Sequence, residues 1–308
     1  MAVFRRANTI GEISTKKISK PNHYSIIGFL FVLPAFIYFL IVYMYPFLSS
    51  ISLTMLDVKR TGTTFVGLKH YSKVLSDELF WRSLLNTLYL SSISVPITIL
   101  LALVIAILMD KMTSRIYRNI LQIVSLLPMM MSMVAAALIF QWIFDPIYGI
   151  LNTFLEFIGL ERKGWLNTPE LVIPSLSVIS IWLRVGFNAT ILLAGLQAIP
   201  SHYYEAAIID GASPAKSFFC ITLPLLNPQI ILVLISEIIF TIKTFEQVYI
   251  TTGGGPANFS RVIILHLYET AFKWFNFGEA SVIAFLLFLM LITVSILQWV
   301  FLRKKIEY

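Results

Sequence analysis

Six apolar runs constrain this chain more than any other feature, because each is long enough to cross a lipid bilayer. A helix spans the hydrocarbon core with about 20 apolar residues and satisfies its own backbone hydrogen bonds there. Of the 308 residues, 58% are hydrophobic and 13% are charged, whereas an ordinary soluble domain carries about 25% charged residues. The sequence therefore predicts an all-α, polytopic membrane protein. The six predicted spans are 26–47, 84–109, 121–144, 171–196, 230–250 and 280–302.

The cysteines and histidines exclude several kinds of site. A single cysteine, Cys220, rules out an internal disulfide and a cysteine-cluster metal site. The four histidines are scattered, and His202 beside Glu205 lacks the His-Glu-x-x-His spacing of a zinc pair. We therefore expect no metal site and no catalytic residue in this chain.

Basic residues near the predicted spans indicate orientation, because Lys and Arg are enriched in cytoplasmic connections. With the N-terminus inside, 12 basic residues lie in the cytoplasm and 9 outside, and Arg184 and Lys243 lie within spans. The basic connection 110–118 and the basic C-terminal end then both lie inside. We therefore expect both termini in the cytoplasm.

Composition divides the chain into four predicted parts. A basic tail, 1–25, precedes a first span that lacks a small-residue cleavage site, so this span is expected to be an uncleaved anchor. Residues 26–83 form that span and an outer loop, 84–302 form a core of five spans, and 303–308 form a second tail. The core contains a cytoplasmic loop at 197–228.

The first half of this loop has the pattern of a short helix that ends at a glycine corner. Ser201 is a candidate N-cap, and residues 203–210 fit two helical turns with acidic residues near the positive end. Gly211 is placed to end the helix, because glycine accepts left-handed geometry.

The second half of the loop has the pattern of another helix. Ser213 is a candidate N-cap, and Pro214 suits the first helical position, where a missing N–H costs nothing. Pro224 is expected to close this helix. The whole loop is therefore a predicted helix-turn-helix that projects from the membrane and contacts another protein.

The loop residues also carry a resemblance. Glu205-Ala206-Ala207 is followed after three residues by Gly211, and after nine more by Ile-Thr-Leu-Pro at 221–224. This spacing resembles, at every fixed position, the EAA signature of permease subunits of binding-protein-dependent ABC importers. Further blocks are similar to the carbohydrate-uptake branch of that family, and they lie at 65–71, 145–152 and 252–256.

The resemblance implies a type I ABC importer permease fold with six transmembrane helices, in a bacterial plasma (inner) membrane. The loop would form a coupling helix that docks in a cleft of a separate ATPase. Glu205 would make the polar contact, Ala206 and Ala207 would keep the contact face thin, Asp210 would lie beside it, and Gly211 would set the bend. The alternative, an ordinary surface helix-turn-helix, stays open at this point.

The resemblance also implies partners. They are a second homologous permease, two ATP-binding subunits, an extracytoplasmic solute-binding protein and a sugar substrate, with no nucleic acid. The chain has no Gly-x-x-x-x-Gly-Lys-Ser/Thr loop, so ATP and Mg²⁺ would be used by the partner ATPase and no cofactor would bind here. Transport would follow alternating access.

Polar side chains recur at helical spacing in the fourth and fifth predicted spans. A charge at bilayer depth costs about 2.5–3.5 kcal/mol on insertion scales, so each one needs a partner or a wet cavity. Spacings of three and four residues place each set on one helix face. We therefore expect a polar cavity between these spans. The two sets are Ser180, Arg184, Phe187 and Asn188, and Glu237, Thr241 and Thr244 with Lys243 and Glu246 nearby.

When the loop signatures serve as anchors, the resemblance to maltose-type permeases implies sugar contacts in this cavity. Sugar hydroxyls would pair with polar side chains, and a sugar ring would stack on Phe187. As an alternative, Arg184 and Glu237 pair only with each other. Because the cavity would hold two cations, Arg184 and Lys243, an acidic sugar stays open as an alternative substrate. The implied contacts are Ser180, Leu183, Arg184, Phe187, Glu237, Thr241 and Lys243, and Thr244 completes the expected pathway set.

Three rival functions differ in what they require. An importer for amino acids or peptides would share the fold but not the carbohydrate-type flanks. A membrane enzyme would need a catalytic constellation such as Gly-x-Ser-x-Gly, which the sequence lacks. A secondary transporter would need no ATPase.

Overall fold

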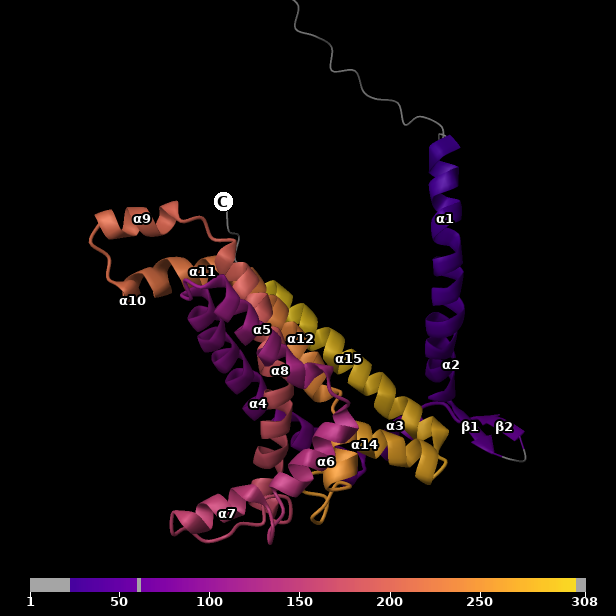
Figure 1. The fold of residues 1–308 in the computed structure, drawn as a ribbon. Coiled ribbons are helices and arrows are strands. Elements are labelled where there is room, and N and C mark those ends of the chain that lie inside the picture. Colours follow the sequence, from indigo (N-terminus) through magenta and orange to yellow (C-terminus); the bar gives the residue numbers. More distant parts are fainter. Residues whose placement is uncertain (1–22, 60–61, 303–308) are drawn as a thin grey trace, which may run out of the picture. The chain divides into compact units, whose positions relative to one another are not determined.

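The computed structural model describes residues 23–59 and 62–302, so the predicted tails lie almost entirely outside the described residues. The chain divides into two compact units, Met1–Ser52 and Leu53–Tyr308. The first holds the first predicted span, and the second holds the rest (Figure 1).

The first predicted span is one long helix with a π-helical interval. Helices α1 (His23–Phe39), η1 (Leu40–Met44) and α2 (Tyr45–Leu53) follow one another without a gap. The 26 residues Gly28–Leu53 are apolar enough to cross a membrane, and 0% of their most apolar stretch is buried. Its length and composition therefore fit a single membrane span.

The second unit consists of helices and one small hairpin. Its elements are β1 (Leu56–Lys59), β2 (Gly62–Phe65), α3 (Lys69–Leu75), α4 (Glu78–Asp110), α5 (Arg115–Met130), α6 (Met133–Ile143), α7 (Ile150–Phe157), α8 (Pro169–Gln197), α9 (His202–Ile209), α10 (Pro214–Ser217), η2 (Phe218–Thr222), α11 (Leu223–Leu225), α12 (Asn227–Ile242), α13 (Glu246–Thr251), α14 (Ile263–Tyr268), η3 (Glu269–Lys273) and α15 (Phe277–Leu302).

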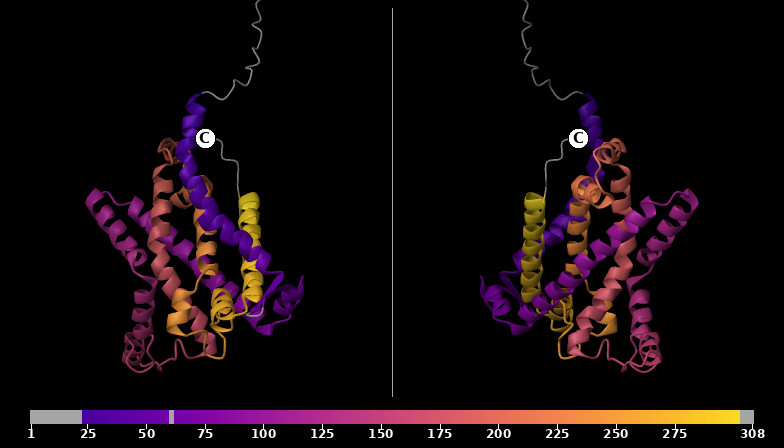
Figure 2. Two further views of the ribbon diagram at one scale, coloured as in Figure 1. Left: turned by 90° about the vertical axis from the view of Figure 1, so that its right-hand side faces the viewer. Right: turned by 90° about the vertical axis from the view of Figure 1, so that its left-hand side faces the viewer.

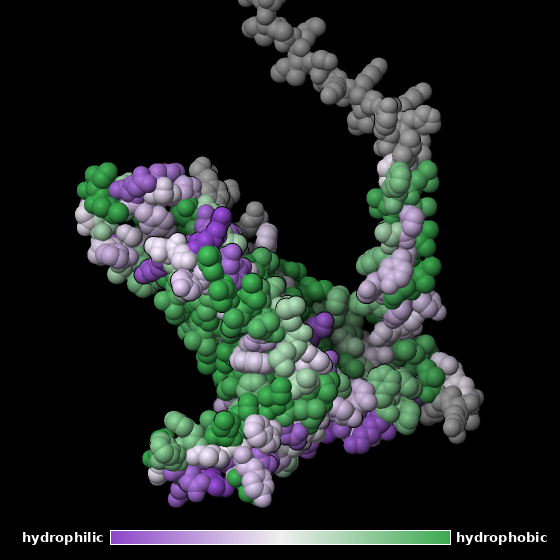
Figure 3. Space-filling model, in the orientation of Figure 1, coloured by the Kyte–Doolittle hydropathy of each residue, from purple (hydrophilic) through white to green (hydrophobic). Residues whose placement is uncertain are grey.

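Four of the predicted spans in this unit are confirmed as apolar helices of membrane-spanning length. They are α4, α8, α12 with α13, and α15. Their apolar surface forms the broad hydrophobic region of the space-filling view, and polar residues gather toward the two ends (Figure 3). Helices α9 and α10 lie at one end, and α7 lies at the other (Figure 2).

Two predicted spans contain a break, although α12 with α13 keeps membrane-spanning length across its break. The span predicted at 121–144 is broken into α5 and α6, which meet at an angle of 94°. The backbone is extended at Met131 and Ser132, three residues after Pro128 in the last turn of α5. The span predicted at 230–250 is interrupted between Ile242 and Glu246, where Phe245 leaves the helical region of backbone geometry.

A two-stranded antiparallel hairpin lies between α2 and α3, and the all-α prediction did not include it. Its register runs from Leu56 opposite Phe65 to Lys59 opposite Gly62. The β-branched residues Val58, Thr63 and Thr64 favour extended backbone over helix.

Helix α8 is the central element of the second unit. In its most apolar stretch 61% of residues are buried, against 28–33% in the other apolar helices of the unit. One hydrophobic cluster joins Leu90 of α4, Leu176 of α8 and Val248 of α13, and a second joins Met109, Leu192 and Val233. The polar residues that α8 carries are therefore held at the centre of the bundle.

A close approach between α5 and α8 depends on one glycine. A Cβ atom at Gly186 would lie 1.7 Å from the carbonyl oxygen of Ser125. That oxygen belongs to the backbone, so no side-chain rotation relieves the clash. Only glycine permits this separation of the two helices.

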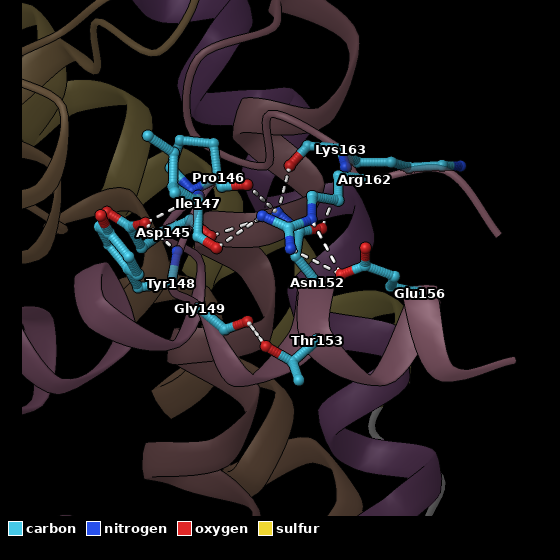
Figure 4. Close-up of polar contacts among 10 residues, drawn as sticks. All are labelled: Asp145, Pro146, Ile147, Tyr148, Gly149, Asn152, Thr153, Glu156, Arg162 and Lys163. Atoms are coloured by element: carbon cyan, nitrogen blue, oxygen red, sulfur yellow. Dashed lines mark hydrogen bonds and ion pairs between the residues drawn. The ribbon is translucent and has the colours of Figure 1, made fainter. Parts of the chain in front are cut away.

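The loop between α6 and α8 is tied together by one buried amide (Figure 4). The Asn152 side chain donates to the carbonyls of Asp145, Pro146 and Lys163 at 3.2, 3.2 and 2.9 Å. Its oxygen accepts from the Lys163 N–H and from Trp165 Nε1, both at 3.0 Å. The sequence block 145–152 thus has a structural role as the anchor of this loop.

Asp145 fixes the turn that precedes α7. Its Oδ1 accepts from the N–H groups of Ile147 and Tyr148 at 2.8 and 2.7 Å (Figure 4). These backbone hydrogen bonds hold the pKa of Asp145 below its ordinary value. Arg162 closes the loop from the other side, donating to the Ile147 carbonyl and pairing with Glu156.

We expect Gly186→Ala to destabilise the protein by about 1–3 kcal/mol, because α5 and α8 must separate to admit the new methyl group. The temperature of thermal unfolding in detergent measures this loss. Gly164→Ala is the matched control, since its Cβ would meet Thr168 Cγ2 and Asn167 Cβ at ordinary distances of 3.4 and 3.5 Å. Equal unfolding temperatures for the two variants would contradict the close approach.

We expect Asn152→Ala to loosen the loop 145–165, because three carbonyls and two N–H groups lose their partner. Leaving such groups unpaired costs about 1–3 kcal/mol, which corresponds to roughly tenfold or greater acceleration of amide exchange. Hydrogen exchange across the loop is the measurement. Asn167→Ala, an exposed amide in the same loop, is the control and should leave exchange unchanged.

Candidate functional site

The loop that the sequence singled out is a helix-turn-helix at one end of the second unit (Figure 1). Helix α9 carries Glu205, Ala206 and Ala207, and the last of these is buried while the first two are exposed. Asp210 caps the C-terminal end of α9 and is exposed. The predicted contact residues are therefore brought together on one short helix.

Gly211 makes the corner that the sequence predicts. Its φ is +73°, in the left-handed region. Its N–H donates to the Ile208 carbonyl at 3.0 Å, and the Ala212 N–H donates to the Ala207 carbonyl at 2.8 Å. These two bonds close the helix in a Schellman arrangement.

The second helix of the loop begins as predicted and continues further than predicted. Ser213 Oγ accepts from the Lys216 N–H at 3.3 Å, and Pro214 occupies the first turn. Pro224 does not close the helix, because η2 and α11 continue through it to Leu225. The predicted Ser201 cap makes no side-chain capping bond. Tyr204 Oη lies 2.9 Å from Thr222 Oγ1 and joins the two helices.

Two exposed isoleucines beside the signature residues were missed by the sequence reasoning. Ile208 is 73% exposed and Ile209 is 85% exposed on α9. These two apolar side chains lie on the same short helix as the exposed Glu205 and are accessible to another protein. Helical spacing from Glu205 to these positions could have indicated it.

Polar residues of α8 and α12 meet in a buried cluster. Arg184 Nε lies 3.2 Å from Glu237 Oε2, and both side chains are more than nine-tenths buried. Asn188 Nδ2 donates to the same carboxylate oxygen at 2.7 Å, and Arg184 Nη2 donates to Ser236 Oγ at 3.1 Å. The two predicted polar faces therefore do face each other.

The Arg184 guanidinium also lies between two aromatic rings. Its central carbon is 4.8 Å from the Phe187 ring centroid and 4.6 Å from that of Phe240. Planar guanidinium groups stack favourably on aromatic faces. The ion pair and both rings hold this cation near the middle of α8.

A cavity of about 300 Å³ opens beside this cluster. It lies where the two broken helices meet, because its wall includes Met133 at the start of α6 and Lys243, Thr244 and Glu246 at the break before α13. Arg184 also lines it. Irregular backbone at membrane depth is tolerated where it lines such a cavity.

The predicted pathway residues divide into two groups. Arg184, Lys243 and Thr244 line the cavity, with Ser236 and Phe240, which the sequence reasoning missed. The others are not among its lining residues. They are Ser180, Leu183, Phe187, Glu237 and Thr241, of which all but the half-buried Phe187 are buried.

Two of the buried residues have partners that explain their position. Ser180 Oγ accepts from Gln247 Nε2 at 2.9 Å, which links α8 to α13. Thr241 Oγ1 donates to the Glu237 carbonyl one turn back at 2.6 Å. Gln247 was missed by the sequence reasoning, because its role in joining α13 to α8 depends on its contact with Ser180, which lies far away in the sequence.

The segment between α13 and α15 holds another buried ion pair, between Arg261 and Glu269. His266 lies beside it, with Nε2 3.5 Å from Asp77 Oδ2. Burial lowers the pKa of His266, so its neutral form is favoured at neutral pH. Within residues 23–59 and 62–302 no group of three or more His, Cys, Asp or Glu side chains could hold a metal ion.

Comparison with known proteins identifies relatives along most of the chain. The pattern of the family described as "Binding-protein-dependent transport system inner membrane component" matches residues 98–306. The trehalose/maltose transport system permease protein MalF of Thermococcus litoralis is 33% identical over 275 residues, covering 88% of this chain and 91% of the relative.

A second relative and a solved structure agree with this match. The sulfoquinovosyl glycerol transport system permease protein SmoG of Agrobacterium fabrum is 30% identical over 283 residues, with 91% of each chain covered. A chain from a bacterial ABC transporter involved in the import of the acidic polysaccharide alginate superposes with a TM-score of 0.80 at 25% identity, covering 92% of this chain and 97% of that one. The chain belongs to the family of inner membrane components of binding-protein-dependent transport systems.

Proposed function

We propose that this chain forms half of the translocation pathway of an ATP-driven, binding-protein-dependent sugar importer, with an oligosaccharide as the substrate class. The single observation that carries the proposal is the cavity where α8 meets the broken helices. Family membership makes the chain a multi-pass transport subunit of the inner membrane and not an enzyme. The relatives named for trehalose and maltose and for sulfoquinovosyl glycerol support a sugar.

The cavity has the chemistry that a sugar requires. Ser236, Thr244 and Glu246 supply hydroxyl and carboxylate groups, and Phe240 supplies an apolar face. Sugar hydroxyls bind polar groups of this kind, and sugar rings stack on aromatic faces. At about 300 Å³ within one chain, the cavity becomes a full site when a second, homologous permease contributes the opposite wall.

The remaining pathway residues have a supporting role in this proposal. Glu237 and Asn188 position the Arg184 guanidinium, and Leu183, Thr241 and the Ser180–Gln247 contact pack the wall behind it. Phe187 holds the guanidinium from one side.

An acidic sugar is the second candidate. Arg184 and Lys243 both line the cavity, and one solved relative belongs to an importer of an acidic polysaccharide. Glu237 neutralises Arg184, so Lys243 is the cation that would select a carboxylate, with Glu246 opposing it.

Transport follows from the loop and the cavity acting together. A solute-binding protein delivers substrate outside, and two ATPase subunits use ATP and Mg²⁺ inside. Each ATPase contacts one coupling loop, here through Glu205, Ala206, Ala207 and Asp210, with Gly211 fixing the corner. Both termini lie in the cytoplasm in this proposal, on the side of the coupling loop.

We expect Glu205→Arg to reduce the amount of ATPase that copurifies with the chain by about tenfold or more, because a reversed charge is placed in the contact surface. Mass spectrometry of the mildly solubilised complex is the measurement. Gly211→Trp should act the same way by straining the corner. Glu161→Arg, an exposed reversal in the loop after α7, is the control. Full retention in the Glu205 variant would remove the coupling role.

Neutralising the buried pair separates its two roles. Glu237→Gln leaves Arg184 buried and unpaired, so we expect a loss of stability of about 3–5 kcal/mol and low yield. In Arg184→Gln with Glu237→Gln no charge remains, so yield should recover while uptake of labelled sugar stays low. Ser236→Ala, which removes one weaker contact of Arg184, is the control for yield. Normal uptake by the double variant would show that the pair serves only stability.

A further inference from the structure

A second polar cavity, of about 480 Å³, lies between α5 and α8 and belongs to neither region described above. Helix α5 contributes Arg115, Arg118, Asn119 and Gln122 to its wall, and α8 contributes Gln197. The two arginines are three residues apart, so they share one face of α5. Two guanidinium groups and three amide groups thus converge on one space.

The charge of this cavity is one-sided. Its lining contains two arginines and no Asp or Glu. Among the residues that the structure describes, neither arginine has an ion-pair partner, and Asp110 lines a different cavity, beneath the coupling loop. Arg118 is half-buried and Arg115 is exposed. The site is therefore rich in donors and open to an anion from outside the chain.

The position of the cavity favours a particular anion. Arg115 opens α5 shortly after α4 ends at Asp110, and Gln197 is the last residue of α8 before the coupling loop. The cavity therefore lies where the helices leave the apolar region, which is the level of lipid phosphates. Guanidinium forks match the oxygens of a phosphate group in pairs.

We propose that this cavity binds a phosphate oxyanion through Arg115 and Arg118, with the amides of Asn119, Gln122 and Gln197 as further donors. The oxyanion comes from an anionic lipid headgroup at the membrane surface or from soluble phosphate. The inference does not depend on which solute the importer carries, so it can fail while the proposed function stands.

The test uses the full chain, purified in mild nonionic detergent with the partner subunits that copurify. Phosphatidylglycerol, phosphatidylcholine and inorganic phosphate are added separately at equal ionic strength. Native mass spectrometry measures bound lipid, and thermal unfolding measures stabilisation. We expect phosphatidylglycerol, but not phosphatidylcholine, to bind and to raise the unfolding temperature. An equal effect of inorganic phosphate would identify a soluble anion as the ligand, and its absence would identify the lipid.

Variants assign the effect to the cavity. Arg118→Gln should weaken the binding of phosphatidylglycerol about tenfold, because it removes a charge-assisted hydrogen bond to the phosphate. Arg118→Lys keeps the charge but loses the paired N–H donors of the guanidinium, so its affinity for phosphatidylglycerol should lie between those of the wild type and Arg118→Gln. If Arg118→Gln cannot be purified, Arg118→Lys serves as the test variant. Lys111→Gln removes a charge from the same connection but outside this cavity, so it is the matched control.

Two results would overturn the proposal. One is equal binding of phosphatidylglycerol by the wild type and by both Arg118 variants. The other is an equal loss in Lys111→Gln and Arg118→Gln, which would mean general attraction to basic residues and no defined site. A loss of phosphatidylglycerol binding confined to the Arg118 variants supports the site.

Discussion

The ion pair between Arg184 and Glu237 is the interaction on which the middle of the molecule depends. A guanidinium at this depth needs a counter-charge, and α12 must lie against α8 to provide it. Asn188 reinforces the same carboxylate, and two aromatic rings confine the cation. The pair thereby fixes how these helices face each other and where one wall of the cavity stands. Because Glu237 neutralises Arg184, this charged side chain can line the cavity within an otherwise apolar bundle.

Much of this arrangement could be predicted from the sequence, because the signals are local. Apolar length identifies the spans, and spacings of three and four residues identify the polar faces that Arg184 and Glu237 share. The corner at Gly211 and the cap at Ser213 follow from backbone preferences of single residues. The predicted roles of Glu205 and its neighbours stay predictions, since they depend on a partner chain.

Other features could not be predicted, because they arise from packing between distant segments. The bend between α5 and α6 and the break before α13 fall inside stretches whose mean hydropathy is that of a single span. Helical spacing grouped Ser180 and Thr241 with the cavity, but their hydroxyls are satisfied elsewhere. Conversely, Ser236 and Phe240 could be recognised as lining residues only from the structure, because the cavity that they line forms beside the break at Lys243. The spacing of polar residues predicts which side chains share a helix face, but it does not predict which neighbouring segment that face contacts.

The contact at Gly186 has a mechanical consequence. With no side chain between them, the backbones of α5 and α8 interlock at Ser125, so neither helix can slide along the other without a collision. A shift of one helix along the other would therefore have to break this contact. This pair ends at Met131 and Ser132, where extended backbone separates α5 from α6. Gly186 thus fixes the spacing of α5 and α8, and α6 turns away from α5 at an angle of 94° just beyond that contact.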